Sequence, residues 1–191
     1  SENTTFNASV FSSQIKDAID WAYNDITYAA QAINVDQEKR KGMEISTAHK
    51  FDNNWSMNAS YTYLKVQQDF NNGEGYLTNG SAAPNLYRAG VKYQKDKLIV
   101  DLTMRAATGQ MYSYLGKFAK DYGPTKAYAD NDYFTWDLGM QYKLNKSSKV
   151  FAQFNNINNA CYQEYSGLYS NGGIKYPAAS RNFVVGMEYS F

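Results

Sequence analysis

Tyrosines and lysines gather in two segments that show no regular apolar pattern, and these residues are the best suited in the chain to bind a ligand. Aromatic ring faces stack on flat groups and lysines attract anions, so the combination suits a flat, anionic small molecule. Tyrosine is also abundant throughout the chain, with 18 copies, so a ligand role and a structural role stay open for each residue. The candidate ligand-binding residues are Tyr112, Tyr114, Lys117, Tyr122, Tyr128, Tyr165 and Tyr169.

The chain offers no set of side chains for catalysis or for holding a metal. It has one histidine, His49, and one cysteine, Cys161, so it offers no Cys–His pair at a plausible spacing and no zinc cluster. Its aspartates lack the spacing of a calcium loop. The formal net charge of +1 shows no basic excess for nucleic acid. We therefore predict a protein that is not an enzyme, with no catalytic residues, no cofactor and no metal site.

Strict alternation of apolar and polar residues marks the elements that would position these segments. In Tyr133–Leu144, Phe134, Trp136 and Leu138 begin an apolar series that continues at every second residue, with polar or small residues between them. This period of two predicts a strand whose faces meet different solvents. Similar alternation recurs in Thr4–Ser12, Trp55–Tyr63, Asn85–Tyr93, Leu98–Arg105, Lys149–Asn155 and Asn182–Phe191.

The average composition resembles that of a water-soluble protein, but it is also compatible with a membrane protein that crosses the bilayer with strands. Mean hydropathy is −0.62, and no run approaches the roughly 18 apolar residues that a spanning helix needs. A transmembrane strand is apolar only at every second residue, so it gives a weak signal. Aromatic residues make up 16% of the chain, and tyrosine and tryptophan suit a membrane–water boundary.

The connections between the predicted strands alternate in length. Short turns are expected at Asp52–Asn54, Gln94–Asp96 and Asn145–Ser148, and long polar loops at roughly 67–84, 106–131 and 157–179, with a shorter first loop near 13–27. Short turns on one side and long loops on the other are typical of bacterial outer-membrane barrels. The sequence therefore predicts an all-β fold, a transmembrane antiparallel up-and-down β-barrel of about eight strands.

The segment Thr27–Phe51 allows two interpretations. Two strands with a turn at Asp36–Lys41 would place the Asp52 turn on the wrong side of the sheet. One long strand, bulged near Val35, preserves the alternation of connections and leaves the C-terminus on the periplasmic side. We favour the single strand.

Several motifs, in order along the chain, resemble the C-terminal part of the TonB-dependent outer-membrane receptors. Ala32–Glu44 resembles the family's "Asn-Val … Gly-Val-Glu" strand, and Asn58–Leu64 the Tyr-Thr-Tyr strand that follows. Phe154–Asn159 resembles the "Asn-Leu-Phe-Asp-Lys-Tyr" element. Tyr176–Phe183 resembles the closing "Pro-Gly-Arg-Thr-Phe" strand, although Ser180 stands where glycine is usual. The stretch Pro84–Tyr93 is similar to the descending strand between them.

The resemblance implies a receptor whose plug domain sits inside a roughly 22-stranded barrel. It implies TonB-dependent uptake of a ferric siderophore, haem, cobalamin or a similar scarce ligand across the bacterial outer membrane. Nothing in residues 1–191 matches a plug or a TonB-interacting segment. We therefore expect the chain to be the last eight strands of such a barrel, with the plug domain and the N-terminal strands absent.

Charged residues within the strands should avoid lipid, because Lys or Arg facing the middle of a membrane costs roughly 2–4 kcal/mol. We expect them to face the lumen. The predicted lumen-facing residues are Glu44, Arg88, Lys92, Asp101, Arg105, Asp137 and Glu188.

Partners follow from the same interpretation. The terminal Tyr189 and Phe191 resemble the signal read by the barrel-assembly machinery. Further expected partners are outer-membrane lipid and lipopolysaccharide, which the basic run Lys39–Lys41 could meet, the TonB complex through the missing plug, and a small-molecule metal chelate.

A self-contained eight-stranded barrel with a structural or adhesive role is the alternative. It requires Thr4–Phe11 to pair with Asn182–Phe191. A hydrogen-bond ladder between these two segments would favour the small barrel over the receptor.

Overall fold

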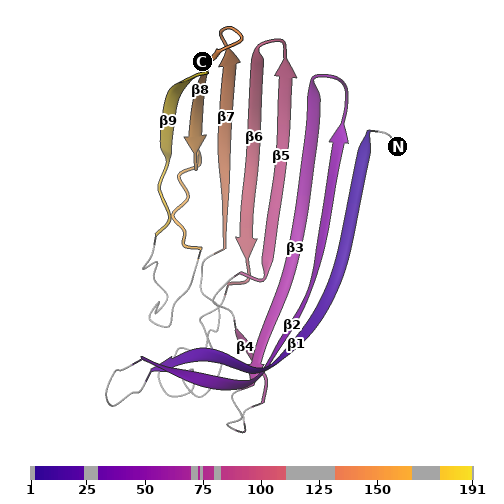
Figure 1. Ribbon diagram of the computed structural model, residues 1–191, viewed down its shortest axis with the longest axis vertical. Helices are drawn as coiled ribbons and strands as arrows, with labels where there is room; N and C mark the ends of the chain where they lie inside the picture. Colours follow the sequence, from indigo (N-terminus) through magenta and orange to yellow (C-terminus); the bar gives the residue numbers. More distant parts are fainter. Residues whose placement is uncertain are drawn as a thin grey trace.

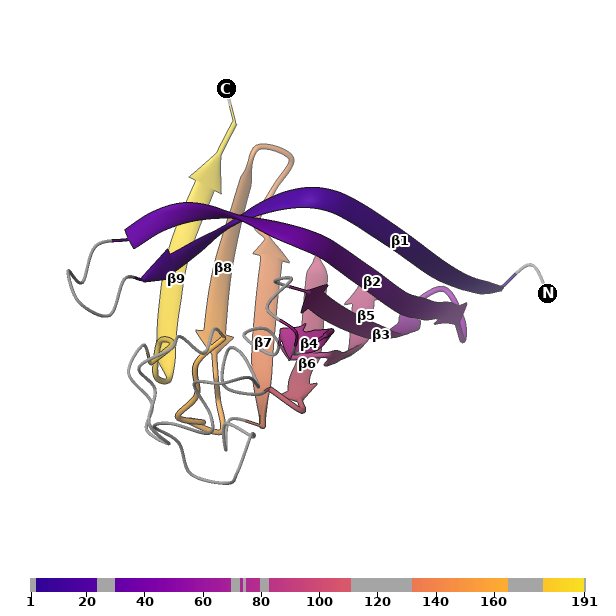
Figure 2. The same cartoon turned by 90° about the horizontal axis from the view of Figure 1, so that it is seen from below.

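A single curved antiparallel sheet makes up most of the protein in the computed structural model (Figures 1 and 2). The structure describes residues 3–23, 30–69, 73, 75–79, 83–110, 132–164 and 177–190. No helix among these residues is long and apolar enough to cross a membrane.

The sheet has nine strands, and eight of them follow one another in chain order. The exception, β4, is a short strand that pairs with the far end of β3. The strands are β1 Thr4–Tyr23, β2 Ala30–Lys50, β3 Trp55–Asp69, β4 Leu77–Asn79, β5 Asn85–Lys95, β6 Leu98–Thr108, β7 Tyr133–Lys143, β8 Ser148–Asn155 and β9 Asn182–Tyr189. The predicted up-and-down order of eight strands is confirmed.

The three short turns lie together at one end of the sheet, at the top of Figure 1. Asp52 accepts hydrogen bonds at Oδ1 from the backbone N–H of Asn54 and of Trp55, both at 2.7 Å. Asn145 accepts one from the backbone N–H of Ser147 at 2.8 Å. Asp96 has a φ of +51°, a left-handed conformation that aspartate tolerates better than most residues. Side-chain hydrogen bonds therefore stabilise the turns at Asp52 and Asn145, and a left-handed residue allows the tight turn at Asp96.

The segment 27–51 contains one strand, as favoured from the sequence. β2 pairs with β1 in constant register from Thr4↔His49 to Tyr23↔Ala30. The bulge expected near Val35 is absent, because Ala18↔Val35 keeps the register of Lys16↔Gln37, and only the pair between Asp17 and Asp36 is missing from the ladder. Asp17 has a φ of +54° there.

Two predicted loops contain strands. β1 runs to Tyr23, so the loop expected near 13–27 is mostly strand, because its backbone finds hydrogen-bond partners along β2, which is one residue longer. β4 lies within the loop expected at 67–84. Local polarity suggested loops at both places, but pairing with a neighbouring strand satisfies the same backbone groups.

The sheet is open in the part of the chain that the structure describes. β1 pairs with β2 and β9 pairs with β8, and no ladder joins β1 to β9. The ladder that a self-contained eight-stranded barrel requires is therefore not found between these strands.

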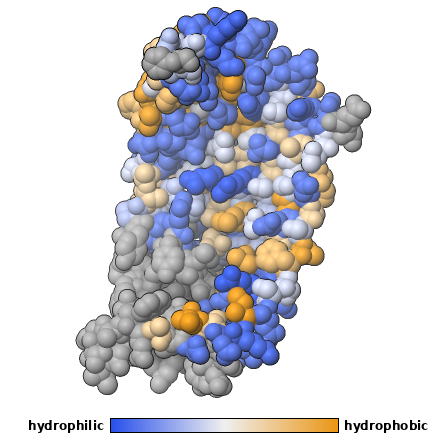
Figure 3. Space-filling model, in the orientation of Figure 1, coloured by the Kyte–Doolittle hydropathy of each residue, from blue (hydrophilic) through white to orange (hydrophobic). Residues whose placement is uncertain are grey.

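The two faces of the sheet differ sharply in polarity. One row of paired positions contains Met57, Val91, Leu102, Leu138, Phe154 and Phe183, all apolar. The next row, on the opposite face, contains Asn58, Gly90, Thr103 and Asp137. We call these the apolar face and the polar face. Figure 3 shows hydrophilic side chains gathered at the short-turn end of the molecule.

The apolar face is exposed rather than packed into a core. Val10 is 84% exposed and Phe183 is 69% exposed. The buried residues are mostly polar, and include Glu38, Gln68 and Asn156. This reverses the arrangement of a water-soluble protein. An apolar solvent around the sheet would account for it.

Aromatic pairs border the apolar face at two heights. Near the short turns, Trp55 and Tyr93 have ring centroids 4.7 Å apart. Toward the other end, Tyr61 and Tyr87 stack at 4.9 Å, and the Tyr61 hydroxyl donates to Asn85 Oδ1 at 2.8 Å. Two aromatic girdles flanking an apolar band are characteristic of transmembrane barrels.

We expect Gly42→Ala to destabilise the sheet. A Cβ at Gly42 would collide with the backbone oxygen of Tyr63 and with the Phe11 ring, and the backbone of a paired strand cannot move without disturbing its ladder. The free energy of unfolding, measured by urea titration of the receptor refolded in lipid vesicles, should fall by about 1–3 kcal/mol.

Gly90→Ala is the matched control, because a Cβ there meets only the Asn58 side chain, at 3.2 Å. That side chain is exposed and can rotate away. An equal loss of stability in both variants would contradict the argument from backbone collision.

Candidate functional site: the polar face and its outer end

The seven residues predicted to face the lumen all lie on the polar face. The register places Arg88 opposite Arg105, Lys92 opposite Asp101, and Glu188 opposite Lys149. Asp137 and Glu44 occupy the same face, opposite Thr103 and Thr62 respectively. The period of two is enough to bring these charges together, since successive side chains in a strand point to opposite faces.

Arg105 organises the end of this face that lies away from the short turns. Its Nη2 donates to the Tyr162 hydroxyl at 3.2 Å, and its Nη1 donates to Glu164 Oε1 at 3.4 Å. Its Nε lies 3.9 Å from Asp137 Oδ2. One guanidinium thus ties the segment after β8 to the faces of β6 and β7.

Stacking and burial strengthen the same attachment. The rings of Tyr133 and Tyr162 stack with centroids 4.1 Å apart, and Tyr162 is only 5% exposed. Gln110 donates from Nε2 to the backbone oxygen of Glu164 at 3.2 Å. Residues 162–164 are therefore held against the polar face at three points. Cys161, next to them, is exposed.

Asn156 is the centre of the turn that starts this segment. Its backbone N–H donates to Asp137 Oδ1 at 2.7 Å. Its side chain donates to the backbone oxygens of Ala160 and Ala179, at 2.8 and 3.2 Å, and accepts from Ala160 N–H at 2.8 Å. Asn156 is 3% exposed, so one buried amide joins the two ends of the connection between β8 and β9.

Two further asparagines of the turn complete the sheet. Asn158 accepts from Trp136 N–H at 3.1 Å and donates to the Phe134 oxygen at 2.9 Å, which replaces a ladder partner beyond the end of β8. Asn159 accepts from Arg181 N–H at 3.1 Å. The motif Phe154–Asn159 therefore performs a structural task that its sequence did not reveal.

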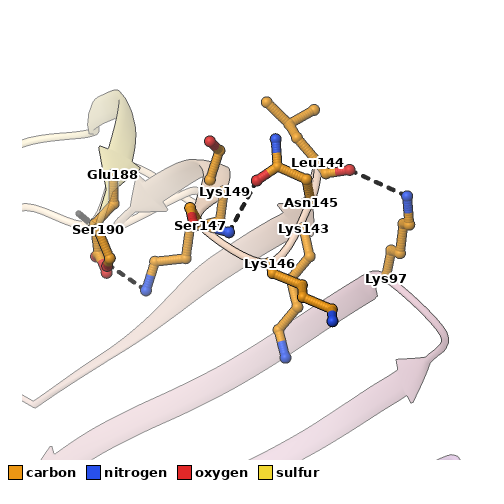
Figure 4. A pocket seen from close by; sticks show the side chains of 10 residues that line it. Lys97, Lys143, Leu144, Asn145, Lys146, Ser147, Lys149, Glu188 and Ser190 are labelled. Atoms are coloured by element: carbon orange, nitrogen blue, oxygen red, sulfur yellow. Dashed lines mark hydrogen bonds and ion pairs between the residues drawn. The ribbon is translucent and has the colours of Figure 1, made fainter.

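A basic hollow of about 620 Å³ lies at the opposite end, beside the short turns (Figure 4). Lys97, Lys143, Lys146 and Lys149 contribute to its lining. Lys97 Nζ donates to the Leu144 backbone oxygen at 3.1 Å, and Lys149 Nζ lies 3.0 Å from Glu188 Oε2. Four lysines with one carboxylate leave this rim positively charged.

The predicted ligand-binding residues lie outside the described part of the chain, as does Phe191. They are Tyr112, Tyr114, Lys117, Tyr122, Tyr128, Tyr165 and Tyr169. Their expected role therefore stays a prediction. Among the described residues, no three side chains of His, Cys, Asp or Glu gather as a metal site would require.

Comparison with known proteins identifies the family. The family model described as "TonB dependent receptor-like, beta-barrel" matches residues 1–157. The chain belongs to the TonB-dependent receptor β-barrel family. These receptors are transporters of the bacterial outer membrane and not enzymes. None of the curated proteins compared matches the chain.

Solved structures agree on the fold. The copper transporter OprC has a TM-score of 0.76 at 17% identity, covering 100% of this chain and 29% of its own. The FrpB iron transporter from Neisseria meningitidis (F3-3 variant) has a TM-score of 0.75 at 20% identity, covering 100% and 30%. The ferripyoverdine receptor of the Pseudomonas aeruginosa outer membrane, bound to ferripyoverdine, has a TM-score of 0.67 at 17% identity. The match covers 99% of this chain and 25% of the receptor. The chain thus spans less than a third of the length of each of these three proteins.

We expect Asn156→Gly to loosen the turn after β8. Glycine keeps the φ of +51° without strain, so the change removes only the side-chain hydrogen bonds. Leaving buried backbone groups without partners should lower the free energy of unfolding by about 2–4 kcal/mol, measured by urea titration of the refolded receptor.

Asn159→Gly is the control, since Asn159 has a φ of +53° and is exposed. The hydrogen bond that its side chain accepts from Arg181 N–H should contribute at most about 1 kcal/mol. Similar losses in both variants would show that Asn156 has no special role.

Proposed function

We propose that residues 1–191 are the C-terminal part of the barrel of a TonB-dependent receptor that takes up a scarce ligand across the bacterial outer membrane. The ligand class is a ferric siderophore, haem, cobalamin or a similar compound. The remaining strands and the plug domain belong to the rest of a longer protein, and TonB drives uptake through that plug.

The observation that carries the proposal is the open, two-faced sheet. An exposed apolar face needs lipid, and a polar face with Arg88, Arg105 and Asp137 needs water or protein. Both edges of the described sheet lack a neighbour, and such edges favour pairing with further strands. A larger barrel whose lumen holds a plug supplies lipid for the apolar face, water or protein for the polar face, and neighbouring strands for the two edges.

Copper and iron transporters among the similar structures support metal uptake as the general task. The direct test is uptake of radiolabelled ferric siderophores, haem iron and cobalamin by cells that carry the full-length receptor. We expect one ligand class to accumulate, and accumulation to stop when TonB is deleted. No uptake of any of them by cells with a correctly inserted receptor would refute the proposal.

The loop tyrosines and lysines are our proposed ligand contacts. Replacing Tyr112, Tyr114, Tyr122 and Tyr128 together by alanine should weaken binding of the transported ligand about tenfold or more, because ring stacking and cation–π attraction are lost. Binding is measured by titration of the purified receptor. The matched variant with four phenylalanines keeps the rings and should retain most of the affinity. Unchanged affinity in the alanine variant would exclude these tyrosines.

Tyr189 and Phe191 are our proposed contacts with the barrel-assembly machinery. Tyr189 lies on the apolar face at the end of β9 and is 57% exposed. Deleting Phe191 should reduce the amount of receptor in outer-membrane fractions several-fold, as quantified by immunoblotting. Normal levels of the deletion variant would contradict this role, and a Phe191→Tyr variant, which keeps a terminal aromatic, should assemble normally.

A further inference from the structure

Three lysines form a patch on the apolar face, just beyond its last apolar row. Lys41 of β2 lies directly opposite Lys65 of β3, and Lys39 follows two residues along the same face. We call Lys39, Lys41 and Lys65 the outward lysine patch. It lies toward the end of the sheet opposite the short turns, the end that carries the long connections.

The change from apolar to cationic is abrupt. Val10, Met43 and Tyr63 form one row of paired positions on this face, and Val10 is 84% exposed. The next row on this face is Ser12, Lys41 and Lys65. Two residues along a strand advance about 7 Å, so the ammonium groups can reach only a short distance beyond the apolar band. A membrane whose hydrocarbon layer ends at the row of Val10, Met43 and Tyr63 would have its lipid headgroups at the depth of these lysines.

Asp69, which pairs with Gln37, is a carboxylate on the same face as the outward lysine patch, one row beyond Lys39 and two rows beyond the Lys41–Lys65 pair. Glu38 points to the polar face, where it accepts from Arg40 and Gln68. The ion pairs found among the residues that the structure describes include none of the three lysines. Like charges placed directly opposite each other destabilise a sheet. The pair Lys41–Lys65 is therefore a pair that an anion would stabilise.

Lys39 is already held in place. Its Nζ lies 3.6 Å from the centroid of the Tyr76 ring, and the Tyr76 hydroxyl donates to Gln37 Oε1 at 2.5 Å. A cation–π contact restricts the lysine side chain, so less conformational entropy is lost when it meets an anion.

We propose that the outward lysine patch binds the phosphate groups of lipopolysaccharide in the outer leaflet. This inference rests on the proposed function only in placing the apolar face against lipid. A phosphorylated lipid fits better than a free phosphate because the row of Val10, Met43 and Tyr63 offers apolar surface to acyl chains directly beside the lysines. The site therefore matches both parts of such a lipid.

The test compares the full-length receptor with a variant carrying Lys39→Gln, Lys41→Gln and Lys65→Gln. Binding of bisphosphorylated lipid A is measured by titration into receptor nanodiscs of zwitterionic lipid. A lysine near an anionic surface is worth about fivefold in affinity, so the variant should bind lipid A at least about tenfold more weakly. Wild-type binding should weaken with added salt more steeply than that of the variant.

Lys95→Gln is the matched control. Lys95 belongs to the same face as Lys41 but lies beside the short turn at the other end, so this variant should bind lipid A like the wild type. Equal lipid A binding by the triple variant and the wild type would overturn the proposal. Displacement of lipid A by millimolar inorganic phosphate would overturn the choice of a lipid.

The two proposals can fail independently. The lysines lie on the face opposite Arg105 and the other polar-face charges, so ligand uptake by the triple variant is expected to match the wild type when the receptors are equally abundant. Absence of uptake in both would count against the transport function alone. Loss of lipid A binding with normal uptake would support the lipid site.

Discussion

Everything in this structure depends on the need to satisfy backbone hydrogen bonds in a single layer of strands with different surroundings on its two faces. A membrane interior offers no partners to a peptide group, so each strand must bond to its neighbours along its whole length there. The constant registers between neighbouring strands meet this requirement, except along the outer edges of β1 and β9 in the described sheet. Apolar and polar side chains must then alternate along each strand. The row that contains Met57 is apolar, and the next row, which contains Asn58, is polar.

The strand pattern and the distribution of charge could be predicted from the sequence because both are local. Alternation in Tyr133–Leu144 indicated the two faces of β7. The register places the seven charges that were predicted to face the lumen on one face of the sheet, and that this face borders the lumen stays a prediction. The one long strand in 27–51 followed from an argument about the whole chain, because a second strand there would have placed the Asp52 turn at the wrong end of the sheet. The length of β1 did not follow from the sequence, because polar residues from Ser13 onward resemble a loop until a partner strand is known.

The attachment of the segment after β8 was not predictable. Arg105 and Glu164 are 59 residues apart, and no periodicity connects a residue within a strand to one in an irregular segment. The motif Phe154–Asn159 was noticed for its resemblance, but the role of Asn156 depends on Ala160 and Ala179 coming together. Buried amides that bond to backbone groups leave no pattern of their own in a sequence. The ligand contacts stay open for a related reason, since they lie in segments without alternation.

The short turns and the long connections differ in how far their lengths can change without disturbing the sheet. Register between neighbouring strands is set at turns such as Asp96–Lys97, where one extra residue would move every lysine and tyrosine of a strand to the wrong solvent. The connections at the opposite end can gain or lose residues without that penalty. A lineage could therefore exchange the long connections while inheriting the same sheet, and recombination at that end would be tolerated where recombination at the short turns would not.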